Sequence, residues 1–275
     1  MVNVTRAVGE LESPHFMSED IPFIREPSNV TLEFRCLGTF VFHGRGEWQS
    51  GPARARGGEF LEYFVNHPHA AVGRESLCDV LWPDGDTERC AHRLHLAASG
   101  ARAAVRQECG ALNPIVFADG TYSWNPAVHV ERDTDRFERC FQDGSCGAYE
   151  RGVASYLGEF LAGAMADWVV PLRVRYENMY VTMLERLAFE AFHADDLPRA
   201  TDYALKVVAA DRAHERATQI AMVCLAKSGR RNLAIKEYYN LKRYLQKWLG
   251  VKPMGDTEEI RRMILDGRTE SLQIS

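Results

Sequence analysis

The chain has 275 residues, of which 46% are hydrophobic and 26% are charged, and its formal net charge is −5 at pH 7. These values are ordinary for a soluble globular protein of about two domains. No stretch of about 18 apolar residues is present, which excludes a membrane-spanning helix, and the N-terminal residues lack the basic and apolar regions of a signal peptide. We therefore expect a cytoplasmic protein whose contacts with nucleic acid, if it makes any, are confined to one basic face of an acidic chain.

Seven cysteines are spread along the chain without a Cys-x-x-Cys pair. An odd number of widely spaced cysteines is typical of reduced, mostly buried thiols in a cytoplasm, and we expect that state here. All six lysines lie at Lys206 or later, so every earlier cation is an arginine. Arginine is suited to planar, bidentate recognition of phosphate and guanine, although a GC-rich genome that favours arginine codons accounts for the same bias.

The first part of the chain predicts a small domain that mixes strands and helices. Residues 1–29 contain three prolines and several acids, and we expect them to form a flexible N-terminal arm. Residues 31–42 are rich in β-branched and aromatic types, which predicts a strand pair or a short sheet, and the glycine-rich residues 43–58 predict a loop. Three helical segments follow, at about residues 59–67, 74–82 and 88–108.

The next segment, residues 115–124, consists of two short β runs around Asp119-Gly120. An Asp-Gly pair in this setting is the strongest short-range hairpin signal in the chain. Strands, three helices and then a hairpin are the order of a winged helix, so we expect residues 30–126 to form an α+β winged-helix DNA-binding domain. The hairpin would be its wing, and the third helix would enter the DNA groove.

From about residue 133 to residue 265 the pattern is helical throughout. Self-comparison gives a period of 34 residues, in which Ala200 matches Ala234 and Ala188 matches Met222. A helix–turn–helix unit of 34 residues is the signature of tetratricopeptide-like repeats, which stack because no single unit can bury its apolar face alone. We therefore expect residues 127–275 to form an all-α helical-repeat domain, so that the chain is mainly α overall.

Short motifs in both halves match one family in order and spacing. In the first half they are Leu37–Phe40, Asn66–Pro68, Arg74–Leu77, Leu81–Asp84 and Gly120–Tyr122. In the second half they are Tyr156–Leu161, Asp167–Trp168, Leu184–Ala188, Gly229–Arg230, Ala234–Tyr238 and Leu249–Pro253. Over residues 30–265 the chain resembles the Streptomyces antibiotic regulatory proteins, which join an OmpR-type winged helix to a bacterial transcriptional activator domain. The resemblance implies a nucleoid-associated activator that binds repeats in double-stranded promoter DNA as a homodimer and contacts RNA polymerase.

The third helix departs from this family where DNA would be read. Relatives have a Ser-Arg-Leu-Arg-Arg-like run, and the aligned stretch here, residues 99–103, keeps one arginine. Helical spacing predicts a core face made of Leu94, Ala98, Ala101 and Val105. The adjacent polar stripe, which we expect to contact DNA, consists of His95, Ser99, Arg102 and Arg106. A solvated helix surface without any DNA contact accounts for the same stripe.

Two other segments are candidates for DNA contact. Arg54 and Arg56 precede the first helix, near the place where relatives carry a basic residue, and we expect them to contact phosphates. A solvated loop is the alternative for this pair. Thr121 and Tyr122 lie on the expected wing, close to the minor groove or the backbone of the DNA.

The acidic balance of the first half supports a different function. Residues 30–126 carry nine arginines, no lysine and eleven acidic residues. The alternative is therefore a winged-helix and repeat scaffold that binds protein partners and has lost sequence-specific DNA binding. Cys90, His92 and His95 lie close in sequence, but no second ligand pair stands at zinc spacing, so we expect no metal site. Neither a nucleotide-binding loop nor a catalytic motif occurs, so we expect no cofactor and no enzymatic activity.

Overall fold

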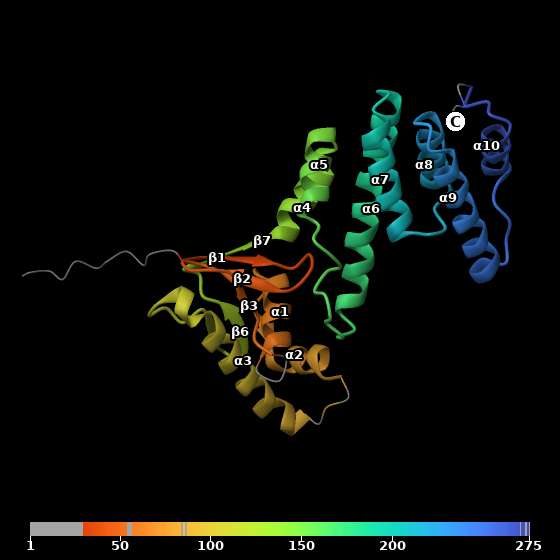
Figure 1. The fold of residues 1–275 in the computed structure, drawn as a ribbon. Helices are drawn as coiled ribbons and strands as arrows, with labels where there is room; N and C mark the ends of the chain where they lie inside the picture. Colours follow the sequence, from red (N-terminus) through yellow and green to blue (C-terminus); the bar gives the residue numbers. More distant parts are fainter. Residues whose placement is uncertain are drawn as a thin grey trace, which may run out of the picture.

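The computed structural model describes residues 30–53, 57–83, 85, 87–269, 271, 272 and 274. The arm expected at residues 1–29 lies outside these described residues, as do Arg54 and Arg56. Figure 1 shows strands and helices packed together at one end of the molecule and a row of helices at the other. None of the helices in the described part of the chain is long and apolar enough to cross a membrane.

In its described residues, the N-terminal half holds two small sheets and three helices. In chain order its elements are β1 (Val30–Arg35), β2 (Val41–His43), β3 (Gln49–Ser50), α1 (Gly58–Asn66), β4 (Val72–Gly73), α2 (Arg74–Leu81), α3 (Thr87–Cys109), β5 (Ile115–Ala118), β6 (Thr121–Trp124) and β7 (Val128–Arg132). One sheet has the strand order β3-β2-β1-β7 and the other has the order β4-β6-β5. The strand pair, the three helices and the hairpin predicted from the sequence are all present. Sequence analysis missed β3 and β4, which at two residues each are too short for an alternating pattern to appear.

The strand β7 follows the wing and returns to the first sheet. It pairs in parallel with β1, so that Val128 lies opposite Val30 and Arg132 opposite Phe34. The domain boundary expected at residues 126/127 precedes β7. The first sheet is therefore completed by residues that lie on the C-terminal side of that boundary.

The wing hairpin has the turn type that its sequence predicts. Ala118 and Thr121 are paired across it, and the two residues between them have positive φ angles, 50° at Asp119 and 76° at Gly120. A two-residue turn of type I′ needs left-handed backbone at both positions, and its twist matches that of the flanking strands. The Asp-Gly pair therefore specifies this turn through the backbone preferences of its two residues.

The two halves of the chain share one hydrophobic core. Phe160 and Leu161, which precede the long helix α6 (Val169–His193), are buried in the same cluster as the winged-helix core. The amide of Leu161 donates to the carbonyl oxygen of Cys36 at 2.7 Å, and that of Ala162 donates to the carbonyl oxygen of Gly38 at 2.9 Å. Two motifs that carried the family resemblance, one from each half, thus meet at this junction.

Charged side chains reinforce the junction. Both carboxylate oxygens of Asp133 accept backbone hydrogen bonds from the N-terminal half, from the amide of Cys36 at 2.8 Å and from that of Leu37 at 2.9 Å. The guanidinium of Arg173 donates to the carbonyl oxygens of Phe160 at 2.9 Å and of Leu161 at 2.8 Å. A continuous core with these bonds at its edge sets the orientation of the helical row relative to α3.

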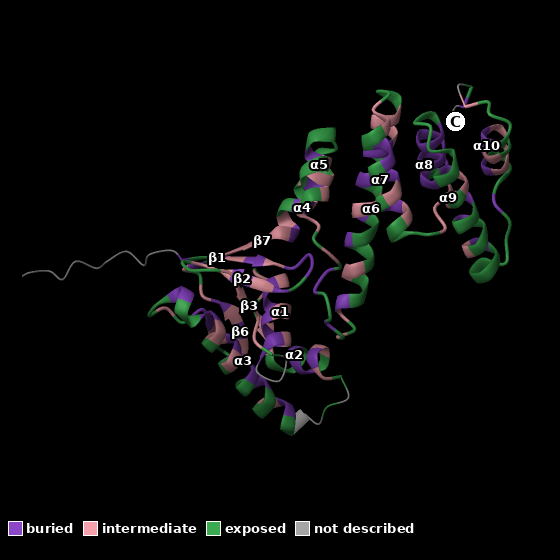
Figure 2. Ribbon diagram, in the orientation of Figure 1, coloured by how far each residue is buried: buried purple, intermediate pink, exposed green. Residues whose placement is uncertain are grey.

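The C-terminal half is built from helices. They are α4 (Asp133–Asp143), α5 (Cys146–Ser155), α6, α7 (Leu197–Ala210), α8 (Glu215–Lys227), α9 (Arg231–Tyr244), the π-helical turn η2 (Leu245–Leu249) and α10 (Gly255–Leu265). From α6 to α9 each helix packs against the next. Helix α8 lies inside this row with ten of its thirteen residues buried, and Figure 2 shows it mostly in purple. The structure confirms the expected fold class, a winged helix followed by tetratricopeptide-like helices.

The 34-residue period is visible in the turns between helices. Asp195 and Gly229, 34 residues apart, follow α6 and α8 with φ angles of 58° and 74°. The next amides, of Asp196 and Arg230, donate to carbonyls five residues earlier at 2.9 and 2.8 Å. Both turns are therefore Schellman-type helix ends with left-handed backbone at the same position.

The prediction that all seven cysteines are reduced thiols is wrong for one pair. Cys78 in α2 and Cys90 in the first turns of α3 form a disulfide, with their Cα atoms 5.9 Å apart. The two helices contact each other, and this packing brings the two sulfurs together. A spacing of twelve residues in the sequence does not by itself predict the bond. Cys36, Cys109, Cys140, Cys146 and Cys224 are free thiols. Because Cys90 is bonded to Cys78, it is no metal ligand beside His92 and His95 in this state.

Candidate nucleic-acid interface

Helix α3 has one buried face and one polar face. The four residues predicted for the core, Leu94, Ala98, Ala101 and Val105, are all fully buried. In the polar stripe, His95, Ser99 and Arg106 are exposed, whereas Arg102 is half-buried. The spacing of three or four residues places them along one side of the helix. Each of them can form hydrogen bonds with base edges or phosphates.

Arg102 is engaged within the domain. Its Nε donates a hydrogen bond of 2.7 Å to the carbonyl oxygen of Ile115 in β5, and its guanidinium carbon lies 5.9 Å from the centre of the Tyr122 ring. This residue therefore joins the helix to the wing hairpin. The arginine of the stripe that is exposed to solvent is Arg106.

The two predicted wing residues have different surroundings. Thr121 is half-buried, and its hydroxyl donates to the carbonyl oxygen of Ala118 at 2.9 Å. Tyr122 is only 4% exposed and packs against the rings of Phe60 and Phe117, with centroids 5.5 and 4.4 Å away. A ring so buried offers DNA no contact surface, so the geometry does not support the contact expected from Tyr122. The exposed ring of the wing is that of Phe117, which sequence analysis did not single out.

The predicted loop arginines, Arg54 and Arg56, lie outside the described residues. The chain directly after them is held against α3. A Cβ atom at Gly57 would lie 2.1 Å from the carbonyl oxygen of Ala97, and the φ angle of Gly57 is 94°. This close approach and this backbone conformation both need glycine.

A buried carboxylate near the end of α3 binds the loop between β2 and β3. Glu108 is 3% exposed, and one of its oxygens accepts the amides of Gly44, Arg45 and Gly46 at 3.0, 2.5 and 3.0 Å. The other oxygen accepts a hydrogen bond from the side-chain amide of Gln49 at 2.6 Å. These bonds, first among them that from Arg45, lower the pKa of Glu108 and outweigh the effect of burial. Sequence analysis missed this residue, whose spacing from Ala101 and Val105 puts it on the core face of the helix.

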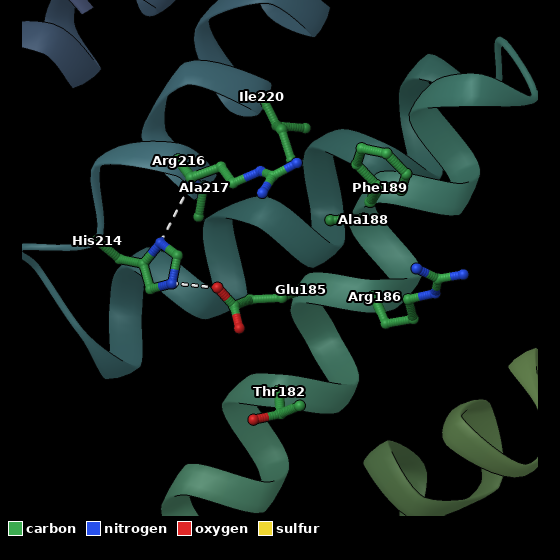
Figure 3. A pocket seen from close by; sticks show the side chains of 9 residues that line it. All are labelled: Thr182, Glu185, Arg186, Ala188, Phe189, His214, Arg216, Ala217 and Ile220. Carbon is green, nitrogen blue, oxygen red and sulfur yellow. Dashed lines mark hydrogen bonds and ion pairs between the residues drawn. The ribbon is translucent and has the colours of Figure 1, made fainter. Parts of the chain in front are cut away.

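A second candidate site lies in the helical row, between α6 and α8. Figure 3 shows a pocket of about 270 Å³ there. Its polar lining residues are Thr182, Glu185, Arg186, His214 and Arg216, and Phe189 is its aromatic residue. Arg186 is paired with Glu190 at 2.7 Å, and the guanidinium carbon of Arg216 lies 5.3 Å from the centre of the Phe189 ring. The pocket therefore combines an aromatic surface with charges of both signs, a character suited to a protein contact.

His214 links the two helices of this pocket. Its Nδ1 accepts a hydrogen bond from the amide of Ala217 at 3.2 Å and so caps the start of α8. Its Nε2 faces the carboxylate of Glu185 on α6, as Figure 3 shows. Because Nδ1 accepts, Nε2 carries the proton and donates to Glu185. The imidazole thus fixes the register of α8 against α6.

Comparison with known proteins agrees with this architecture. Residues 129–265 match the family described as the bacterial transcriptional activator domain. Among solved structures, EmbR of Mycobacterium tuberculosis in complex with a low-affinity phosphopeptide aligns with a TM-score of 0.65 and 17% sequence identity, over 89% of this chain and 67% of its own. At such an identity the likeness shows a common fold. A looser match, with a TM-score of 0.36 and 15% identity, covers 50% of this chain and 89% of the C-terminal TPR-containing domain of an FK506-binding protein from Plasmodium falciparum.

No curated protein matches the chain significantly. The family match begins within β7 and ends with α10, so it covers the strand that completes the first sheet and the helical row. This family is one of transcriptional activator domains and not a family of enzymes. Over residues 129–265 the helical half of the chain is therefore similar to the bacterial transcriptional activator domain family.

Proposed function

We propose that this chain is a transcriptional activator that binds promoter DNA through α3 and the wing hairpin. The observation that carries the proposal is the exposed polar stripe of α3, formed by His95, Ser99 and Arg106 on the side adjacent to the core face. A helix of this kind beside a β-hairpin is the arrangement in which helix-turn-helix proteins insert a recognition helix into the major groove. The activator-domain family of the helical half supports the same conclusion.

Within this proposal the residues have separate roles. Arg106 contacts a guanine or a phosphate, with Ser99 and His95 beside it as hydrogen-bonding partners. Arg102 positions the wing against α3 and contacts DNA with the part of its guanidinium that Ile115 does not occupy. Thr121 contacts the backbone near the wing, and Arg54 and Arg56 supply phosphate contacts from the loop before α1.

The helical half is proposed to act on partners. Its row of helices binds RNA polymerase and a second copy of the chain, which raises the occupancy of polymerase at the promoter. Two copies bound to adjacent repeats in the DNA would place two α3 helices in successive turns of the major groove. This activity is proposed to take place in the cytoplasm, at the nucleoid.

Selection from a pool of randomised DNA duplexes tests the DNA-binding proposal. The purified wild-type protein is expected to enrich one sequence motif, and Arg106→Ala is expected to lose that enrichment. Arg151→Ala is the matched control, because Arg151 is an exposed arginine on α5 and its loss should leave the motif unchanged. Absence of enrichment by the wild type at low salt, where phosphate attraction is strongest, would contradict the proposal.

A second candidate function rests on the state of two predicted contact residues. Arg102 is bonded to the wing and Tyr122 is buried, so fewer of the expected side chains are free to contact DNA. This arrangement favours a protein-interaction scaffold that does not bind specific DNA sequences. The same selection separates the two functions, because a scaffold would enrich no motif at any salt concentration.

A further inference from the structure

A groove lies between the second helices of successive repeats, α7 and α9. Its volume is about 550 Å³. Leu205 and Val208 of α7 contribute an apolar floor, and Tyr244 and Trp248 line its end near η2. We call it the α7–α9 groove. It is distinct from the pocket of Figure 3, which lies between the first helices of the repeats, α6 and α8.

The rim of the α7–α9 groove is cationic. Arg212, Arg243 and Lys247 line it and are exposed, and no carboxylate among the described residues forms an ion pair with any of them. One acid, Glu237, also lines the groove, at 3.4 Å from the side-chain amide of Asn240. Three cations against this one acid give the lining of the groove a net positive charge.

The sequence around the groove is also rich in positive charge. Residues 227–252 contain eight lysines and arginines and one acid, in a chain whose net charge is −5. This segment contains five of the six lysines of the protein. A local excess of cations in an acidic protein attracts partners of opposite charge.

Aromatic rings beside these cations add an apolar contact. The side chain of Trp248 is 64% exposed, its ring centroid is 6.4 Å from that of Tyr244, and the Nζ of Lys247 lies 4.8 Å from the ring. Tryptophan, tyrosine and arginine are the residues on which binding energy concentrates in protein interfaces. An exposed tryptophan next to aliphatic side chains and unpaired cations is therefore the pattern of an unoccupied protein-binding surface.

We propose that the α7–α9 groove binds an acidic peptide segment of a partner protein. Apolar side chains of the segment contact Leu205, Val208 and Trp248, and its carboxylates contact Arg212, Arg243 and Lys247. From Glu237 to Trp248 a helical rise of about 1.5 Å per residue gives a length of about 16 Å, enough for about five extended residues. The aliphatic floor favours a peptide over nucleic acid, because a phosphodiester backbone would leave that floor without an apolar partner. This inference goes beyond DNA binding and does not rest on it.

Fluorescence anisotropy with a defined probe tests the proposal. The probe is a fluorescein-labelled peptide of about twelve residues, in which Glu and Asp alternate with Leu and Phe; its companion carries Gln and Asn in place of the acids. The test variant is Arg243→Glu/Lys247→Glu. The matched control is Lys227→Glu/Lys252→Glu, which changes the net charge equally at exposed positions that do not line the groove. Circular dichroism and thermal unfolding verify that each variant is folded.

We expect the wild type and the control to bind the acidic probe, more weakly as salt rises, and the groove variant to bind it about tenfold more weakly. Trp248→Ala should also weaken binding, although it leaves the charges unchanged. Equal binding of the acidic and neutral peptides, or an equal loss in groove variant and control, would overturn the proposal. So would a groove variant that lost affinity for duplex DNA and kept its affinity for the peptide. The probe contains no DNA. A negative result with the peptide would therefore not contradict the proposal that α3 binds DNA.

Discussion

The Nε of Arg102 donates a 2.7 Å hydrogen bond to the carbonyl oxygen of Ile115, so an arginine expected to contact DNA also joins α3 to the wing. Arg106, four residues further along the same stripe, is exposed, and no described carboxylate forms an ion pair with it. The two arginines therefore differ in what they do for the fold. This difference separates a loss of DNA contact from a loss of structure.

The first prediction compares Arg106→Ala with Arg102→Ala. Arg106→Ala should weaken binding to the selected duplex by about tenfold, the scale of a single arginine contact, and leave the free energy of unfolding unchanged. Arg102→Ala should weaken DNA binding and also lower the free energy of unfolding by about 1–2 kcal/mol, because it removes a charge-assisted hydrogen bond that is partly shielded from water. Anisotropy titrations and urea unfolding measure the two effects. If both variants kept wild-type affinity, α3 would not be the reading helix.

Local sequence determined most of the elements around this site. The core face of α3 follows from its helical period, and the wing turn follows from Asp119-Gly120. The pairing of β7 with β1 could not be predicted, because it joins strands almost a hundred residues apart. The disulfide between Cys78 and Cys90 likewise depends on how α2 packs against α3.

The candidate site was less predictable than the fold. The stripe of α3 was identified correctly as one face, but the sequence did not indicate that Arg102 would be bonded to Ile115, or that Tyr122 would face inward. Both facts depend on which side of the hairpin packs on α1. Glu108 offered a usable signal, since a carboxylate on a core face needs hydrogen-bond partners. Its partners lie on a glycine-rich loop 62–64 residues earlier, which no local pattern could reveal.

The second prediction concerns the pH dependence of Glu108. Its pKa in the folded protein is lowered, chiefly by the hydrogen bond from the amide of Arg45. A lowered folded-state pKa means that the unfolded chain binds the proton more readily, so the group stabilises the fold above the unfolded pKa of about 4.3. That stability is lost as the pH falls through the lower, folded-state pKa.

Glu108→Gln should therefore lower the free energy of unfolding by about 1–3 kcal/mol at pH 7, the scale of hydrogen bonds to a charged group. The difference from wild type should shrink as the pH falls below about 4, where the wild-type carboxylate is itself protonated. Urea unfolding at several pH values measures it. Glu47→Gln serves as the control, since Glu47 is exposed in the same loop. A difference independent of pH would show that the charge of Glu108 is not what the loop binds.

The third prediction is that reducing the disulfide between Cys78 and Cys90 destabilises the folded protein. The bond between Cys78 and Cys90 closes a loop with a sequence separation of 12 residues, and a crosslink of about this size stabilises a fold by about 3 kcal/mol by restricting the unfolded chain. The free energy of unfolding should fall by about that amount when the oxidised protein is treated with a dithiol. Cys78→Ala/Cys90→Ala should be insensitive to the same treatment. Identical unfolding curves for oxidised and reduced wild type would refute the prediction.

The fourth prediction uses the equivalence of Asp195 and Gly229, which hold left-handed backbone 34 residues apart. A Cβ atom at Gly229 would meet nothing within 4 Å, so Gly229→Ala should cost about 1 kcal/mol through its φ angle alone. Asp195→Gly should instead stabilise the protein by about 0.5 kcal/mol, because it removes the same strain from a residue that has a Cβ. Asp195→Ala, which keeps the Cβ atom, should bring no such gain.

The double variant Asp195→Gly/Gly229→Ala tests whether the two turns are equivalent and independent. It moves the glycine one repeat towards the N-terminus, and a full helix–turn–helix unit separates the two positions. Effects at separated sites add, so the gain at one turn should offset about half of the loss at the other in thermal unfolding. If the single variants shifted the unfolding temperature in the same direction, the backbone angle would not be the shared feature of the two turns. The 34-residue period would then reflect helix packing alone.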